Sequence, residues 1–274
     1  MYNNKPHKEY LLNRCSYKLI PRSIDRTVYL QFLSFSDYDY LIHGIFTRIG
    51  GVSKPPYDTL NSSYNVGDRS ERVKENLQTI KDAIGAKYLI SMNQVHGGGI
   101  VILRNDDHTR IESTANTDAL ITDIPSVALM VRQADCQGVI LYDPVKAVLA
   151  VVHCGWRGNV RNFLGAVVNR MKSDFGCAGS DILAAVGPSL GPCCAEFTSY
   201  EEIFPEEFKE FIVRDNHFNL WEISRRQLLD AGLAENRIEI AEICTRCNTD
   251  LFYSYRGEGT TGRFATVAML KEKT

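Results

Sequence analysis

Three side chains that could bind a transition metal stand where strand-like runs of the sequence end. His96 and His153 each follow an apolar run directly, and Cys136 follows another run after a short polar turn. Proteins of the α/β class place their chemistry in such turns at strand ends. One thiolate and two imidazoles would occupy three positions of a zinc tetrahedron and leave the fourth open to water, which is typical of a catalytic zinc site. We therefore take these three residues as the candidate catalytic and metal-binding group.

Other interpretations of the same residues stay open at this point. Each histidine could be held by backbone groups at a strand end, and a lone cysteine is more often a small buried apolar residue than a ligand. Cys136 could also be a nucleophile with His153 or His96 as its base, as in an amidase or an editing hydrolase. A third possibility is a non-catalytic protein that binds a metal or a metabolite.

Three arginines are candidates for holding an anionic substrate. Arg157 lies between Gly155 and Gly158, directly before a predicted helix whose free N–H groups could bind phosphate. Arg48 lies in the glycine-containing segment 47–53, and Arg263 follows Thr261 and Gly262 near the C-terminus. Each of the three arginines could instead lie in a tight turn or be a solvated surface charge without binding substrate. We predict that Arg48, Arg157 and Arg263 bind phosphate or another part of the substrate.

Composition places the chain among soluble globular proteins. It has 274 residues, 44% of them hydrophobic, and a formal net charge of −2, which gives no reason to expect nucleic acid or an anionic membrane as a partner. The polar N-terminus has no signal-peptide pattern, and no apolar run approaches the roughly 20 residues of a membrane span. We expect a cytoplasmic protein. The sequence carries no signal for its oligomeric state.

The eight cysteines do not suggest a disulfide framework, because they are scattered through a long chain without a secretory signal. Cys244 and Cys247 form a single CxxC pair without a second such pair, so a zinc ribbon is not expected. Cys193 and Cys194 are adjacent and are expected to lie in a loop.

Hydrophobic patterning predicts more strands than helices. The runs rich in Val and Ile that we expect to be buried strands are 28–33, 41–47, 88–95, 100–103, 118–122, 127–131, 139–142, 147–152, 182–186, 237–241, 251–254 and 264–270. Apolar faces at helical spacing predict helices from Ser70 to about 84, from just after Gly158 to about 175, from Pro205 to about 212, and over 220–231. The short link between 127–131 and 139–142 predicts an antiparallel pair.

These elements predict an α/β (α+β) fold. We expect a single domain with mixed β-sheets and helices packed outside, without the strict strand–helix alternation of a dinucleotide-binding fold. Residues 1–40 carry little signal, apart from one possible edge strand, and residues 41–274 form one continuous catalytic domain.

Several segments occur together, in order, in one known family. These segments contain the three candidate ligands, the arginine-containing turns and the cysteine pairs. The segments are 46–53, 93–97, 117–122, 134–136, 152–158, 186–194, 244–256 and 261–263. On these segments the chain resembles the laccase-domain (YfiH-like) purine nucleoside phosphorylase family, formerly called multicopper polyphenol oxidases. The resemblance extends over residues 41–270, and the ordered set of motifs is far more specific than any one of them.

The resemblance implies an enzyme with a zinc site made of His96, Cys136 and His153. It implies phosphorolysis of adenosine, inosine, guanosine and methylthioadenosine to the free base and a sugar phosphate, and also deamination of adenosine. Purine nucleosides and phosphate would then be the partners. Copper is less suitable than zinc, because the chain has only six histidines and none are spaced as His-x-His. The chain departs from the family pattern at Gln137-Gly138, Cys154 and Gly257.

Overall fold

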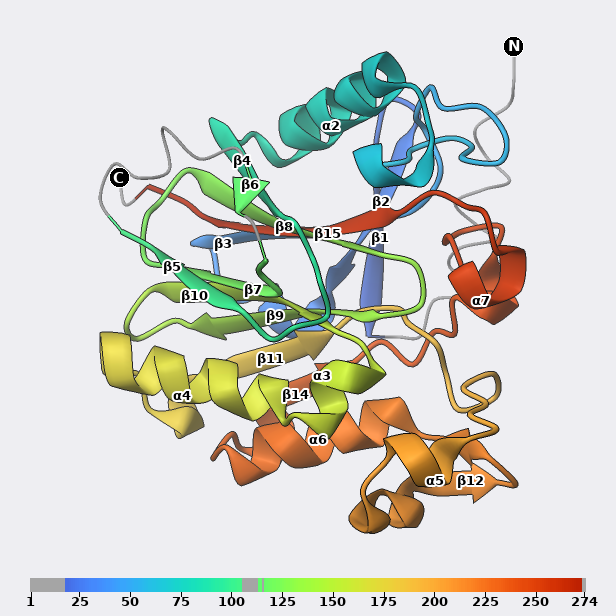
Figure 1. Cartoon of the computed structure of the whole chain (residues 1–274). Coiled ribbons are helices and arrows are strands. Elements are labelled where there is room, and N and C mark those ends of the chain that lie inside the picture. The colour runs from blue at the N-terminus through green and yellow to red at the C-terminus, as the bar shows by residue number, and fades with distance from the viewer. Residues whose placement is uncertain (1–17, 105–112, 115, 273–274) are drawn as a thin grey trace.

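Two β-sheets lie face to face, and helices cover both outer faces of the pair (Figure 1). The computed structural model describes residues 18–104, 113–114 and 116–272. Its layers are a helix, a sheet, a second sheet and a pair of helices. The predicted single α/β domain with mixed sheets and outer helices is confirmed. This arrangement buries both faces of each sheet, which accounts for the near-continuous apolar strands in the sequence.

The larger sheet has seven described strands in the order β1-β2-β3-β15-β8-β4-β6. Their bounds are β1 Leu19–Ile24, β2 Thr27–Phe32, β3 Leu41–Phe46, β4 Tyr88–Met92, β6 Ser113–Thr114, β8 Val127–Gln133 and β15 Phe264–Leu270. Strand β15 pairs antiparallel with both β3 and β8, whereas β4 pairs parallel with β8. The C-terminal ends of β4 and β8 therefore meet at the same edge.

The smaller sheet has six described strands in the order β14-β11-β9-β10-β7-β5. Their bounds are β5 Ile100–Leu103, β7 Ala119–Thr122, β9 Gln137–Asp143, β10 Val148–Cys154, β11 Leu183–Val186 and β14 Ile238–Ile240. Strands β9 and β10 form an antiparallel hairpin, and β11 pairs parallel with β14. A separate two-stranded ribbon consists of β12 Ile212–Arg214 and β13 His217–Phe218.

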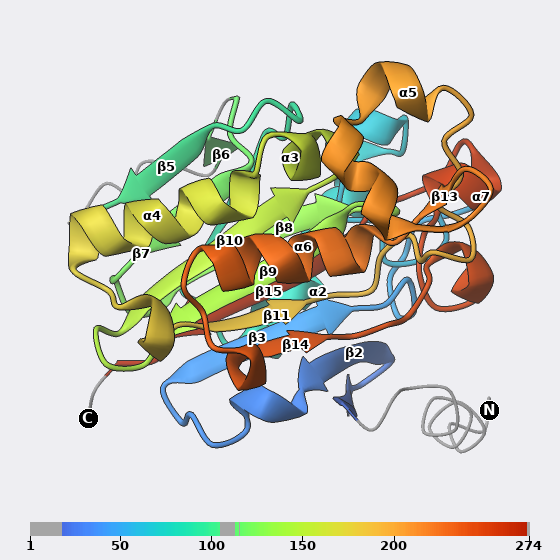
Figure 2. The same ribbon diagram turned by 90° about the horizontal axis from the view of Figure 1, so that it is seen from below.

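Helices seal the outer faces of both sheets. Helix α2 (Ser70–Ile84) covers the larger sheet, while α4 (Phe163–Phe175) and α6 (Leu220–Asp230) lie side by side over the smaller one (Figure 2). The remaining helical segments are α3 Trp156–Val160, α5 Tyr200–Ile203, α7 Tyr255–Glu258 and the 3₁₀ turns Leu33–Phe35, Tyr64–Val66, Gly179–Asp181, Glu206–Phe211, Glu235–Arg237 and Arg246–Asn248.

The main core fills the space between the two sheets. Phe32, Val131, Ile140, Val151 and Phe264 belong to this inner cluster. Separate clusters lie under α2 and under the α4–α6 pair. A fourth, aromatic-rich cluster fixes the segment 190–223 beside the smaller sheet. Because protein cores are packed at the density of organic crystals, these clusters hold the strand ends in fixed relative positions.

Five details of the sequence-based prediction are wrong. The possible edge strand at 28–33 is β2, which lies inside the larger sheet between β1 and β3. Strands β8 and β9 do not pair, because the chain crosses from the larger sheet to the smaller one between them. The predicted strand 251–254 is a turn. The helix expected from Pro205 is the 3₁₀ turn Glu206–Phe211. The helix expected after Gly158 begins earlier, as α3, and breaks at Asn162 before α4.

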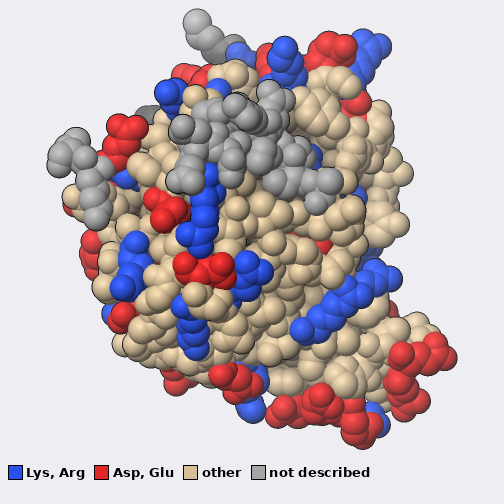
Figure 3. Space-filling view, turned by 60° about the vertical axis from the view of Figure 1, so that its left-hand side comes forward, with Lys and Arg blue, Asp and Glu red and all other residues tan. Residues whose placement is uncertain are grey.

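The described part of the N-terminal segment contributes directly to the larger sheet. Residues 18–40 supply β1 and β2, and β2 pairs with β3. No helix among the described residues is long and apolar enough to cross a membrane. On the face seen in Figure 3, basic and acidic side chains are intermingled, and acidic ones gather along its lower right edge.

A buried histidine in β3 makes the stability of the sheet depend on pH. His43 is almost fully buried, and its Nε2 accepts a 2.7 Å hydrogen bond from the amide of Phe32. Burial lowers the pKa of His43 from 6.5 to about 3. The ring is therefore neutral in the folded protein at pH values where the unfolded chain already binds a proton.

We expect the free energy of unfolding contributed by His43 to be complete above pH 6.5 and to fall as the pH drops toward 3. The decline approaches about 1.4 kcal/mol per pH unit, the value for one bound proton. Urea unfolding at several pH values measures it. The variant His43→Gln keeps an acceptor for Phe32 but does not titrate, so its stability should fall less steeply over this range. Equal pH dependence in both proteins would contradict the assignment.

Candidate metal centre

One edge of the paired sheets brings His96, Cys136 and His153 together. Their ligand atoms, two ring nitrogens and one sulfur, all lie within 4.8 Å of one another. The Sγ of Cys136 is 3.8 Å from Nε2 of His96, and the two imidazole rings are 4.7 Å apart in an edge-to-face arrangement. His96 is exposed, Cys136 is partly exposed and His153 is buried, so the group faces solvent on the His96 side.

His96 lies in the loop that follows β4. Its φ of 58° is in the left-handed region, which a residue other than glycine adopts only when its surroundings hold it there. Gln94 attaches this loop to β8: its side chain donates to the carbonyl of Arg132 and accepts from the amide of Arg132. The loop position therefore follows from the parallel pairing of β4 with β8.

Cys136 lies where the chain passes from the larger sheet to the smaller one. Asp135, directly before it, has a φ of 89°, and its carboxylate accepts hydrogen bonds from the side chains of Thr245 and Ser254 and from the amide of Arg256. These three bonds hold a strained turn in place. They connect the turn that carries Cys136 to two segments that lie more than a hundred residues later in the chain.

His153 lies near the end of β10 and is oriented by Asp118. Strand β10 pairs antiparallel with β7, with Val152 opposite Ala119, so the next residues along, His153 and Asp118, also face each other. The His153 ring Nδ1 is 2.9 Å from Oδ1 of Asp118. This contact directs the other ring nitrogen toward the sulfur and the neighbouring imidazole, as expected for a histidine that binds a metal.

Asp118 also fixes the backbone of the His96 loop. Its carboxylate accepts hydrogen bonds from the amides of His96, Gly97 and Gly98 at 3.1, 2.8 and 3.1 Å. One buried carboxylate therefore positions two of the three candidate ligands. The sequence offered one signal for this role, since Asp118 opens the predicted strand 118–122.

The arrangement of donor atoms fits a metal ion. A tetrahedral zinc with Zn–S near 2.3 Å and Zn–N near 2.0 Å places sulfur and nitrogen about 3.6 Å apart, close to the separation of Cys136 and His96. Gly155 makes room for this geometry: a Cβ at that position would be 2.8 Å from the Cys136 sulfur. Any larger residue at position 155 would therefore displace the thiol.

At neutral pH the Cys136–His153 pair is a thiolate and an imidazolium, so His153 would release its proton on binding a metal. Burial alone would raise the pKa of Cys136, but the charge of His153 and hydrogen bonds to both histidines bring the pKa down to about 6. Burial would lower the pKa of His153, yet the Cys136 thiolate and Asp118 raise it to about 9. For Asp118, the hydrogen bonds and charge of its partners outweigh burial and lower the pKa to about 2. A thiolate is thus available at neutral pH.

Two hollows with different linings meet at the three residues. The first, of about 270 Å³, is lined on its apolar side by Trp156, Leu190, Phe197 and Leu220. The second, of about 370 Å³, is lined mostly by polar residues, among them Asn93, Gln94, Arg132 and Arg263. His96, Ala134, Cys136 and Tyr255 line both hollows.

Two of the predicted arginines lie beside these hollows. Arg157 is exposed at the rim of the apolar hollow, with its guanidinium 4.4 Å from the centre of the Trp156 ring. Arg263 lines the polar hollow, and its Nη1 donates to the carbonyls of Thr261 and Gly262. Arg132, which the sequence analysis did not single out, lines the same hollow.

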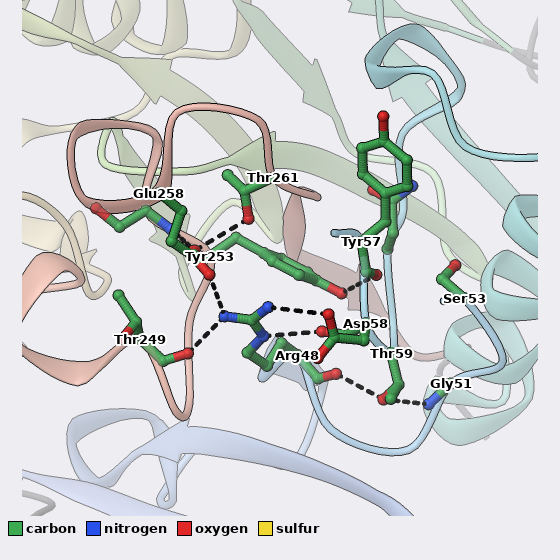
Figure 4. Close-up of polar contacts among 12 residues, drawn as sticks. Arg48, Gly51, Ser53, Tyr57, Asp58, Thr59, Thr249, Tyr253, Glu258 and Thr261 are labelled. Atoms are coloured by element: carbon green, nitrogen blue, oxygen red, sulfur yellow. Dashed lines mark hydrogen bonds and ion pairs between the residues drawn. The ribbon is translucent and has the colours of Figure 1, made fainter. Parts of the chain in front are cut away.

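Arg48 lines neither hollow. Figure 4 shows its guanidinium enclosed by polar partners: it forms a 2.8 Å ion pair with Glu258 and donates to the carbonyls of Thr249 and Asp58. It also stacks on the ring of Tyr253 at 4.5 Å. These contacts link the 47–59 segment to the C-terminal 249–258 segment.

Comparison with known proteins identifies the family. Residues 42–271 match the family described as multi-copper polyphenol oxidoreductase laccase. A purine nucleoside phosphorylase of Bacteroides thetaiotaomicron is 31% identical, in an alignment that covers 88% of this chain and 96% of that protein. Purine nucleoside phosphorylase YlmD of Bacillus subtilis is 30% identical, covering 85% of this chain and 89% of that protein.

The fold agrees with this match. The crystal structure of the Bacillus licheniformis hypothetical protein YfiH aligns with a TM-score of 0.82 and 27% identity, covering 92% of this chain and 99% of the other. The chain belongs to the laccase-domain family.

Replacing Asp118 tests whether it positions the candidate metal ligands. We expect Asp118→Asn to weaken zinc binding by about 10- to 100-fold, because His153 and the His96 loop lose the charged acceptor that orients them. Competition with a chromophoric chelator measures the affinity. Circular dichroism and thermal unfolding serve as the control for folding. Unchanged zinc affinity in a folded variant would contradict the role assigned to Asp118.

Proposed function

We propose that the protein is a zinc-dependent purine nucleoside phosphorylase that acts on adenosine, inosine, guanosine and methylthioadenosine. The observation that carries the proposal is the position of His96, Cys136 and His153 between an apolar, aromatic hollow and a polar, arginine-containing one. A nucleoside combines a flat apolar base with a polar sugar, and its second substrate is an anion. The names of the two bacterial relatives support the same reaction class.

The apolar hollow is suited to the purine. Trp156 and Phe197 are 6.3 Å apart between ring centres, at an angle of 68°, and they line the same wall as Leu190 and Leu220. Aromatic rings bind a flat heterocycle through dispersion and burial of apolar area. The base would enter this side, with the glycosidic bond over His96 and Cys136, which line both hollows.

The polar hollow is suited to phosphate and ribose. Arg263 and Arg132 supply guanidinium groups, which bind phosphate oxygens through charged hydrogen bonds. Phosphate held there would attack C1′ of the ribose as the bond from C1′ to the base nitrogen breaks. Positioning the two reactants and stabilising the charge that develops would supply most of the rate.

His96, Cys136 and His153 would hold the zinc ion. When bound, the ion would supply Lewis acidity next to the reacting bond. Zinc suits this set of donors better than a copper cluster, since one thiolate and two imidazoles form a single tetrahedral site with an open position. Asp118 keeps His153 and the His96 loop in place.

We extend the proposal to deamination of adenosine at the same centre. The purine ring in the apolar hollow would need C6 near the three ligands, with water reaching it from the exposed His96 side. Phosphorolysis yields adenine, whereas deamination yields inosine, so the products separate the two reactions.

The test is incubation of the zinc-loaded protein with adenosine and phosphate, followed by chromatography of the bases and nucleosides. We expect adenine that depends on phosphate, together with inosine and hypoxanthine. Cys136→Ala should abolish all three products together, while Cys177→Ala, which replaces a buried cysteine outside the candidate centre, should retain them. Full turnover by the folded Cys136→Ala protein without metal would overturn the shared centre.

Arg263 and Arg48 should affect different properties. Arg263→Gln is expected to raise KM for phosphate at least 10-fold with a smaller effect on KM for the nucleoside, because a charged hydrogen bond is worth about 1.5–3 kcal/mol. Arg48→Gln is expected to leave KM for phosphate unchanged and to lower stability by about 2 kcal/mol through loss of its buried polar contacts. Steady-state kinetics and denaturant unfolding measure these effects. A raised KM for phosphate in Arg48→Gln, with an unchanged KM in Arg263→Gln, would show that Arg48 is the residue that binds phosphate.

A further inference from the structure

Four cysteines that the proposed reaction does not use converge beside the metal centre. They come from two places in the sequence: the adjacent pair Cys193-Cys194, and Cys244 with Cys247. Their four sulfur atoms all lie within 4.8 Å of one another. The sequence analysis expected no zinc ribbon at Cys244 and Cys247 and placed Cys193 and Cys194 in a loop; the structure brings the two pairs together.

Strand pairing explains the convergence. Strands β11 and β14 are parallel neighbours, so their C-terminal ends leave the smaller sheet at the same edge. The segments that follow remain side by side, joined by an isolated parallel bridge between Ser189 and Cys244. Gly191 permits this close approach, because a Cβ there would be 2.7 Å from the Trp221 ring and 3.0 Å from the Cys244 side chain.

Local turns direct the sulfurs toward a common centre. The amides of Cys194 and Ala195 both donate to the carbonyl of Gly191, which forms the tight turn that carries Cys193 and Cys194. The thiols of both cysteines contact the Cys247 sulfur, at 3.6 and 3.5 Å.

We propose that Cys193, Cys194, Cys244 and Cys247 bind a second zinc ion in a closed, structural site. Zn–S bonds of 2.3 Å in a tetrahedron place the sulfurs about 3.8 Å apart, near the separations found here. Four thiolates leave no open position, in contrast to the centre with two histidines. Cys193 and Cys247 are exposed, which gives the ion a path of entry.

The second ion would join the two loops that support the turn before Cys136. From the first loop, the amide of Leu190 donates to the Asp135 carbonyl. From the second, the hydroxyl of Thr245 donates to the Asp135 carboxylate at 2.6 Å. Leu190 also lines the apolar hollow. A structural ion at this place would therefore fix one wall of the proposed purine site without contacting the substrate.

Metal content of the full-length protein, purified under reducing conditions, tests the proposal. We expect Cys136→Ser to lose the zinc bound with His96 and His153 and to retain the zinc bound by the four cysteines. Cys247→Ser should lose the zinc bound by the four cysteines. Cys177→Ser serves as the matched control and should retain both. Loading the Cys136→Ser protein with Co²⁺ should give the intense thiolate-to-metal absorption of a tetrahedral tetrathiolate site, and this absorption should vanish when Cys247 is also replaced.

A measurement on the unmodified sequence covers the case in which Cys247→Ser does not fold. Mass spectrometry after brief alkylation should show Cys193 and Cys247 protected in the zinc-loaded protein and modified after chelation. The proposal is overturned if Cys136→Ser contains no metal. It is also overturned if the exposed thiols react equally with and without zinc, or if the reduced, metal-exposed protein carries a disulfide within the cluster in place of an ion. None of these outcomes depends on phosphorylase activity, so they test the second zinc site independently of the proposed function.

Discussion

The Asp118 carboxylate is the contact on which the candidate centre depends most. It accepts hydrogen bonds from the His153 ring and from three consecutive amides of the His96 loop. A buried carboxylate is costly unless its oxygens are fully bonded, and here its partners come from two separate ligand-bearing segments. The pairing of β7 with β10 places Asp118 opposite His153. The geometry of the two histidines is therefore a consequence of strand register.

The sandwich of two sheets supplies the third ligand. Cys136 lies at the crossing between β8 and β9, so the position of its sulfur depends on how the larger and smaller sheets pack against each other. Asp135 fixes that crossing by bonding to segments near Thr245 and Ser254. Both the proposed tetrathiolate site and the Arg48 contacts involve the same C-terminal region. The last fifty residues thus act as a support for the turn that carries the candidate ligand.

The sequence was most informative where function depends on residue type and local pattern. The three candidate ligands stood at strand ends, and α2 with its C-terminal Gly85 followed from helical spacing and a left-handed cap. It was least informative where partners are remote in the chain. Glu258 lies 210 residues from Arg48. No local pattern reveals that ion pair, the convergence of four cysteines, or the assignment of β8 and β9 to different sheets.

The most direct test of the central claim is a crystal structure of the zinc-loaded protein with anomalous data collected on both sides of the zinc absorption edge. The account predicts an anomalous peak bonded to His96, Cys136 and His153, with its open side toward the two hollows. A zinc-loaded, active enzyme whose anomalous map shows no peak among these three side chains would contradict it.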